Sequence, residues 1–246
     1  MFSSRSTQLS LVLVYHSLSP SLSLSLSLSL LLSFSPSLPP SSILSSLVVA
    51  LFRLVEPCGG TITLDGVDLL SLGLADVRGR IAAIPQDPVL FSASVRFNLD
   101  PYSRASDAEI WAALEVVRLK SLVAEDPLGL SARVAEDGGN WSVGQRQLLC
   151  VARALLRRPR VLVMDEATSS CDASADALIQ AAVRSEFAQA TVLTIAHRLA
   201  TVLDSSRILV MEKGQLAEQG EVKELLQKEG GLFRALVEGS GSGGAA

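Results

Sequence analysis

The sequence predicts an α/β fold in which helices cover a mostly parallel β-sheet. Four short apolar runs have the length and composition of buried strands, namely IAAI, VLVMD, TVLTIA and RILVME. Helical stretches such as ASADALIQAAVRSEF lie between strands, and this alternation implies parallel pairing through helical crossovers. The chain has 246 residues, of which 48% are hydrophobic, so it carries enough apolar side chains for a large core.

Composition divides the chain into three segments. The first 52 residues contain one charged side chain, Arg5, and consist mostly of Ser, Leu and Pro. The strict Ser-Leu alternation of residues 21–30 has the period of a half-buried strand, but it offers no defined packing partner and several prolines follow it. We therefore expect residues 1–44 to be a non-globular low-complexity segment, residues 45–238 to be the domain, and residues 239–246 to be a flexible Gly/Ser tail.

The domain is expected to begin with the end of a helix. Its sequence SSLVVALFRLVEP places an apolar stripe on one face, and Pro57 ends the helix. The stripe consists of Leu47, Val48, Leu51 and Leu54. TITLDGVDLL then predicts two short strands joined at an Asp65–Gly66 turn, which form a small β piece near residues 58–70.

A helical subdomain is expected at about residues 94–150. Ser106 and Glu109 have the spacing of a capping box in front of the apolar run IWAALEVV. Ser142 and Gln145 have the same spacing, so they predict a second capping box at the start of another helix.

Two acids follow the apolar run VLVM. Asp165 and Glu166 come at the carboxyl end of the predicted strand, where α/β sheets place their ligands. In phosphoryl transfer, one such acid holds Mg²⁺ and a second polarises the attacking water. Taken alone, the pair is at least as consistent with two solvated acids that end a strand.

The sequence WSVGQRQLLCVARALLRRP predicts an anion site at the start of a helix. Ser142 can cap that helix, and Gly144 lets a phosphate approach the backbone closely. The free N–H groups and the positive end of the helix dipole attract negative charge. A plain helix start explains Ser142 and Gln145, but it does not explain why Asp165 follows after one helix and a proline.

With these motifs in their order, residues 45–238 resemble the nucleotide-binding domain of ABC transporters, which has a P-loop NTPase-like fold. The sequence is most similar to the second such domain of the multidrug-resistance-associated (C) subfamily. IPQDPVLFSASVRFNLDP is similar to the Q-loop region, WSVGQ to the signature motif in this subfamily's form, and VLVMDE to Walker B. SSCD is similar to the D-loop and TIAHRL to the switch region.

The resemblance implies ATP and Mg²⁺ as cofactors and gives each motif residue a role. Asp165, Gln86 and Ser45 would bind or sense Mg²⁺, and Gln86 would also couple to the membrane domain. Glu166 would orient the attacking water, and His197 would contact the γ-phosphate. The residues that would contact ATP bound on a partner domain are Ser142, Val143, Gly144 and Gln145.

The family's G-x-x-x-x-G-K-[ST] phosphate loop is absent from the sequence. Ser45 aligns with its last position, Leu44 takes the place of the lysine, and LPPSSI replaces the loop. The glycines that let backbone N–H groups surround a phosphate are missing, and two prolines remove donors. We therefore expect poor ATP binding by the chain alone, and a sheet with an exposed flank.

Alternating Ser and Leu can be encoded by a pyrimidine repeat, and such repeats commonly precede splice acceptors. This favours the hypothesis of a misread intron–exon junction at Ser45.

The resemblance implies the ATP-binding and ATP-hydrolysing domain of an exporter at the cytosolic face of a membrane, in a form that is inactive alone. Its partners would be transmembrane domains, which bind the cargo (organic anions or conjugates in this subfamily), and a second nucleotide-binding domain in a head-to-tail dimer. The alternative is a non-catalytic module that presents only its signature motif to such a partner domain.

Several other classes are disfavoured. ABC-type ATPases of chromosome maintenance insert a long coiled coil between the Q-loop and the signature, whereas Ser142 lies only 56 positions after Gln86, with no heptads between them. A net charge of −4 argues against nucleic acid as a partner. No apolar run reaches the length of a membrane-spanning helix. The three cysteines lie far apart, which fits a reducing compartment rather than a disulfide framework or a metal site.

Overall fold

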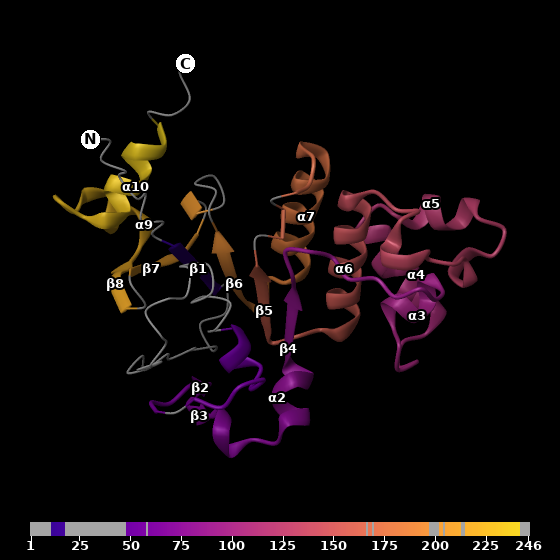
Figure 1. Ribbon diagram of the computed structural model, residues 1–246, viewed down its shortest axis with the longest axis horizontal. Helices are drawn as coiled ribbons and strands as arrows, with labels where there is room; N and C mark the ends of the chain where they lie inside the picture. Colours follow the sequence, from indigo (N-terminus) through magenta and orange to yellow (C-terminus); the bar gives the residue numbers. More distant parts are fainter. Residues whose placement is uncertain are drawn as a thin grey trace, which may run out of the picture. The chain divides into compact units, whose positions relative to one another are not determined.

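The computed structural model describes most of the domain and one strand before it, and these form two compact units (Figure 1). The described residues are 48–57, 59–165, 167–168, 170–196, 202–203, 205–212 and 215–241, with the backbone of Leu11–Ser17. The first unit contains most of Leu11–Ser17, residues 48–71 and the chain from residue 193 onward. The second unit contains residues 72–192.

The second unit packs helices against a pair of parallel strands. β4 pairs with β5 from Ile81↔Val161 to Ile84↔Met164, so the predicted parallel pairing is confirmed here. The elements of this unit are α2 (Leu74–Arg80), β4 (Ile81–Ile84), α3 (Val95–Leu99), α4 (Asp107–Val116), α5 (Lys120–Glu125), η2 (Gly129–Ser131), η3 (Glu136–Gly138), α6 (Val143–Arg157), β5 (Val161–Asp165), α7 (Ala173–Glu186) and the start of β6 (Thr191–Ala196).

Helix α6 is central to the core of this unit. It packs against α3, α4, α7 and β4, and its residues Leu149, Val151 and Ala152 are fully buried. The predicted helical stretch is confirmed by α3 to α6. Both predicted capping boxes are also confirmed, because Ser106 and Ser142 each accept a hydrogen bond from the backbone N–H three positions on, and each donates its own N–H to that residue's side chain.

The contact between α6 and α7 depends on Gly144. This glycine is buried, and a Cβ built on it would lie 2.7 Å from the Cβ of Ala175. Atoms at that separation overlap, and both would be fixed to the backbones of packed helices. The sequence interpretation assigned Gly144 only to phosphate approach and missed this packing role.

The first unit contains an antiparallel set of strands and two C-terminal helices. β1 pairs with β7 from Leu11↔Met211 to Tyr15↔Arg207, and β7 pairs with β8. The predicted hairpin is confirmed, with positive φ at both turn residues, Asp65 and Gly66. The elements of this unit are β1 (Leu11–Ser17), β2 (Thr63–Leu64), β3 (Val67–Asp68), η1 (Leu69–Ser71), β7 (Arg207–Glu212), β8 (Gln215–Gly220), α9 (Val222–Gln227) and α10 (Leu232–Gly241).

Three details of this unit differ from the sequence expectation. β1 lies inside the segment expected to be non-globular; its residues LVLVYHS favour a strand, and it pairs with β7. The helix at residues 48–51 stops early because Arg53 takes a left-handed φ of 48°, so Leu54 is 65% exposed and does not join the stripe. Finally, α10 continues two residues past Gly239, the predicted start of the tail.

None of the described helices is long and apolar enough to span a membrane.

A buried carboxylate joins β8 to α10. Glu218 accepts a hydrogen bond from the Phe233 N–H at 3.0 Å and from Lys228 Nζ at 2.9 Å. Burial raises the pKa of Glu218, but the hydrogen bonds from Phe233 and Lys228 outweigh it, so the pKa lies below its ordinary value of 4.5. The ionised carboxylate therefore stabilises the folded state.

Replacing Glu218 should remove a pH-dependent part of the stability. Because the folded pKa is lowered, the stabilisation is fully present above about pH 4.5 and is lost as the pH falls through the folded value. Glu218→Gln should lower the free energy of unfolding by about 1–2 kcal/mol at pH 7 and by progressively less on acidification. Urea unfolding at several pH values measures this. Glu229→Gln, on an exposed neighbour, is the control; an equal and pH-independent loss in both variants would contradict the account.

The Gly144 packing predicts the effect of one methyl group. Gly144→Ala should destabilise the protein by about 1–2 kcal/mol, because overpacking outweighs the gain in helix propensity. The matched control is Gly79→Ala in α2, where a Cβ meets nothing within 4 Å and the change should be neutral or stabilising. Adding Ala175→Gly to Gly144→Ala should restore part of the loss. Denaturant unfolding tests all four proteins, and equal effects of the two Gly→Ala changes would overturn the prediction.

Candidate functional site

The predicted signature motif forms the N-terminus of α6. Ser142 has extended backbone angles (φ −65°, ψ 160°), and its Oγ accepts a hydrogen bond from the Gln145 N–H at 3.2 Å. The Gln145 Oε1 accepts one in return from the Ser142 N–H at 2.9 Å. Ser142 and Val143 are exposed, and Gly144 is buried. The motif therefore presents the open end of a 15-residue helix, where N–H groups and the helix dipole favour an anion.

The loop before α6 is held by contacts that sequence reasoning missed. The Asn140 side chain accepts from the Ala135 N–H at 2.9 Å and donates to the Arg133 carbonyl at 3.1 Å. Arg146 reaches back from α6 to the Asp137 carbonyl at 2.8 Å. Gly138 has a φ of +69°, and a Cβ there would lie 2.7 Å from Arg146 Cδ. A glycine pair followed by asparagine was the available sequence signal for this ordered turn.

The predicted metal-binding residues emerge at one edge of the β4–β5 pair. Ile84 pairs with Met164, so Asp165, the last residue of β5, and Gln86, two residues after β4, lie at the carboxyl ends of adjacent parallel strands. Asp165 is half-buried and Gln86 is exposed. Carboxylate and amide oxygens are hard donors of the kind that Mg²⁺ prefers, so their chemistry fits the ion. The described residues contain no cluster of three or more His, Cys, Asp or Glu side chains that could hold a metal by themselves.

Other predicted residues cannot be placed in this geometry. Ser45, Glu166, Ser169 and His197 lie outside the described residues. The last residue of the D-loop sequence, Asp172, is described and caps α7: it accepts from the Ala175 N–H at 2.7 Å and from Ser174 Oγ at 2.7 Å. The hydrogen bonds from Ala175 and Ser174 lower the pKa of Asp172, so the cap is ionised at neutral pH.

Helix α6 also holds the segment that contains Gln86. The buried Gln147 donates from Nε2 to the Pro85 carbonyl at 2.8 Å. Further along the helix, Arg153 donates to the Val89 carbonyl at 3.3 Å and to the Asn98 carbonyl at 2.7 Å. No prediction from the sequence covered these side chains, because hydrogen bonds between residues more than 50 positions apart leave no local pattern.

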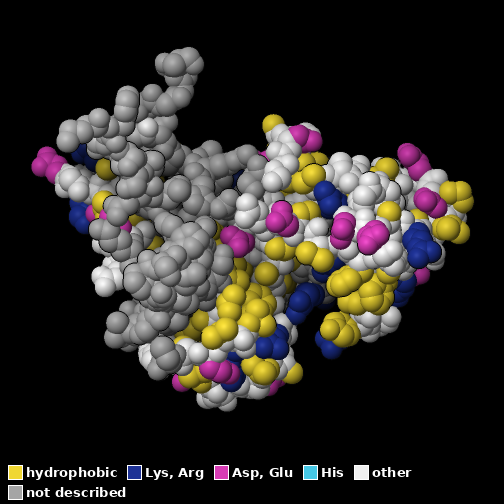
Figure 2. Space-filling view, in the orientation of Figure 1, with side chains coloured by type: hydrophobic (Ala, Val, Ile, Leu, Met, Phe, Trp, Pro, Cys, Tyr) yellow, Lys and Arg dark blue, Asp and Glu magenta, His cyan; other side chains and the backbone are white. Residues whose placement is uncertain are grey.

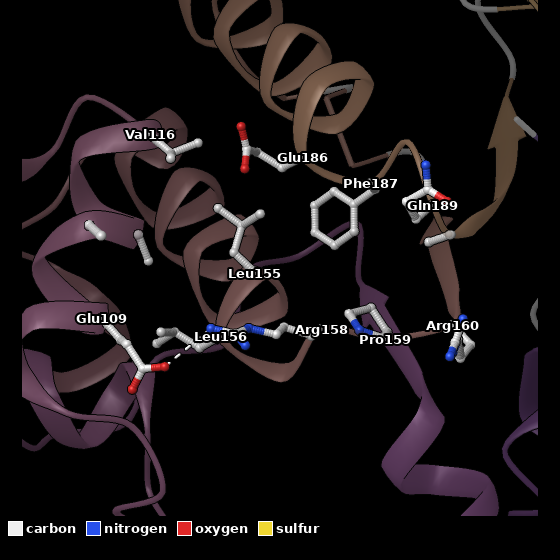
Figure 3. Close-up of a pocket in the computed structure, with 13 residues that line it drawn as sticks. Glu109, Val116, Leu155, Leu156, Arg158, Pro159, Arg160, Glu186, Phe187 and Gln189 are labelled. Carbon is white, nitrogen blue, oxygen red and sulfur yellow. Dashed lines mark hydrogen bonds and ion pairs between the residues drawn. The ribbon is translucent and has the colours of Figure 1, made fainter. Parts of the chain in front are cut away.

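A cavity of about 540 Å³ lies elsewhere in the second unit (Figure 3). Its apolar wall comes from α4 and the end of α6, including Val116, Leu155 and Leu156. At its rim, Arg158 pairs with Glu109 at 3.2 Å. None of the predicted site residues lines this cavity, so it is separate from the signature site.

The sequence of this chain is similar to those of known proteins. The family model described as "ABC transporter" matches residues 44–169. The chain is 54% identical over 189 residues to human "ATP-binding cassette sub-family C member 2", which covers 77% of this chain and 12% of that protein. It is 50% identical over 202 residues to "ABC transporter C family member 3" of Dictyostelium discoideum, which covers 82% of this chain and 14% of that protein. The chain thus spans a small part of these relatives.

The fold has a solved counterpart. The structure described as "a bacterial Atm1-family ABC exporter with ATP bound" matches with a TM-score of 0.75 and 33% sequence identity, over 82% of this chain and 35% of that one. The match extends the sequence similarity to the three-dimensional arrangement of the nucleotide-binding region. With the family model covering half of its residues and its relatives drawn from the C subfamily, the chain belongs to the ABC transporter family.

Proposed function

We propose that this chain is the ATP-hydrolysing domain of a C-subfamily-like exporter, in a form that lacks its own phosphate loop and is inactive alone. The observation that carries the proposal is the capped N-terminus of α6, where Ser142 and Val143 are exposed. An open helix N-terminus supplies unpaired N–H groups to a phosphate. The sequence LPPSSI next to Ser45 supplies neither the glycines nor the lysine of a phosphate loop.

The cofactors of this proposed function are ATP and Mg²⁺. Asp165 and Gln86 would hold or sense Mg²⁺, together with Ser45, and the ion would neutralise charge on the phosphates. Glu166 would polarise the attacking water and His197 would contact the γ-phosphate. These roles come from the position of each residue in its motif.

The proposed partners are the transmembrane domains of an exporter and a second nucleotide-binding domain, at the cytosolic face of a membrane. An apolar patch supports the first partner: Val89, Phe91 and Phe97 are 59%, 54% and 44% exposed, directly after the Q-loop. The rings of Phe91 and Phe97 pack edge to face at 6.1 Å, which keeps the patch ordered. Figure 2 shows hydrophobic side chains gathered over α3, where Phe97 lies. Grouped exposed apolar side chains of this kind are typical of interaction surfaces.

A second candidate is a non-catalytic module that completes the ATP site of a partner domain. The contacts that shape the signature face favour it, since the Ser142–Gln145 cap, the Asn140 turn and the Gly144–Ala175 packing all lie within residues 72–192. None of them needs a phosphate loop. The chain could therefore offer its signature to ATP held by another domain while binding none itself.

A complementation assay tests this trans role. The partner is an intact C-subfamily nucleotide-binding domain whose own signature serine is replaced by arginine, so any ATPase activity must use the signature of the present chain. Adding the folded chain should raise the partner's ATPase rate. Ser142→Arg should lower the stimulated rate about 100-fold, because it blocks the helix N-terminus that contacts developing phosphate charge.

The matched control is Ser121→Arg, which adds the same charge at an exposed serine of α5 and should leave the stimulation intact. Circular dichroism verifies that each variant is folded. No stimulation by the folded parent, or equal stimulation by Ser142→Arg, would count against the trans role.

A further inference from the structure

A buried glutamine outside the predicted site has an energetically unfavourable environment. Gln147 lies on α6, and its side chain is 1% exposed. Its Nε2 donates to the Pro85 carbonyl at 2.8 Å, whereas its Oε1 is buried without a hydrogen-bond partner among the described residues. A buried polar atom without a partner destabilises a fold, and an apolar side chain of the same shape would avoid that cost while losing one hydrogen bond to Pro85, an exposed residue. Because these two effects are of similar size, the stability of the core does not explain the choice of glutamine.

The hydrogen bond from Gln147 lies at the start of the Q-loop and can hold its backbone in place. Pro85 is the first residue after β4, and the predicted Mg²⁺-sensing residue Gln86 follows it. Proline has no N–H, so Pro85 can be fixed through its backbone only by its carbonyl. Because β4 and β5 are in register at Ile84↔Met164, fixing Pro85 also fixes where Gln86 leaves the sheet relative to Asp165.

A second anchor on the same helix holds the other end of this segment. Arg153 lies six positions after Gln147 and donates to the Val89 carbonyl. The five residues from Pro85 to Val89 are thus tied to α6 at both ends. Between the anchors, Gln86 and Asp87 are exposed. A short exposed segment with both ends attached to one rigid helix moves with that helix.

We propose that Gln147 is a positioning residue that couples Gln86 to the signature helix. A displacement at the Ser142 end of α6 is carried through the Gln147–Pro85 hydrogen bond to the start of the Q-loop. The importance of Gln86 rests on the proposed function, but the coupling itself is a property of this chain and needs neither ATP nor a partner domain.

The test measures the mobility of Gln86 in the full chain by backbone ¹⁵N relaxation. In the parent, the order parameters of the Gln86 and Asp87 amides should be near 0.85, the value of rigid backbone. In Gln147→Met, which keeps the shape and removes the donor, they should fall below about 0.6. The thermal midpoint should change little, because removal of the unpaired Gln147 acceptor offsets the loss of the hydrogen bond to Pro85. Gln189→Met, in an exposed loop, is the matched control and should leave the Q-loop unchanged.

Arg153→Met provides a second measurement on the other anchor. It should raise mobility at Val89 and Leu90 while Gln86 stays more ordered than in Gln147→Met, because the Pro85 bond remains. Unchanged order at Gln86 in folded Gln147→Met would overturn the proposal, as would equal loosening by Gln189→Met. The relaxation measurement uses no nucleotide, so its result is independent of the complementation assay. Either proposal can therefore be contradicted while the other holds.

Discussion

The packing of helix α6 is the constraint on which the other features of the site depend. Its first turn is the signature motif, and its interior residues form the core of the second unit. Its polar side chains reach out to hold the Q-loop backbone at Pro85 and Val89. The absent side chain at Gly144 allows α7 to approach, and α7 in turn is capped by Asp172 of the D-loop sequence. A single rigid helix therefore fixes the relative positions of three of the family's motifs.

This arrangement separates the two halves of an ABC-type ATP site. One half is a loop that surrounds the phosphates of bound ATP, and it depends on glycine geometry that LPPSSI cannot adopt. The other half would be the N-terminus of α6, which we propose contacts ATP held by a partner domain, and its shape is set by contacts within residues 72–192. Losing the first half does not remove the second, which is why we propose a trans role even if the chain does not hold ATP through a phosphate loop of its own.

Short sequence patterns predicted the features that depend only on interactions between neighbouring residues. The two capping boxes and the Asp65–Gly66 turn follow from backbone needs of a few neighbouring residues, and they were found where expected. The parallel pairing of β4 and β5 followed from the alternation of strands and helices. Features that depend on distant residues were missed, including the bond from Gln147 to Pro85 and the packing of Gly144 on Ala175. The early end of the first helix was also missed, because it depends on the left-handed conformation of Arg53.

We propose that this chain retains the other motif residues of an ATPase site and lacks the phosphate loop and the strand before it. The most direct test replaces residues 1–44 by a strand and a G-x-x-x-x-G-K loop joined to Ser45, and measures Mg-ATP binding by titration calorimetry beside the parent. We expect little heat from the parent and clear binding by the repaired chain. In the repaired chain, Glu166→Gln should keep that binding and, with a partner domain, lower turnover by about 10²–10⁴, because an amide does not polarise water as a carboxylate does. Low-micromolar binding by the parent, or no binding by a folded repaired chain, would contradict the account.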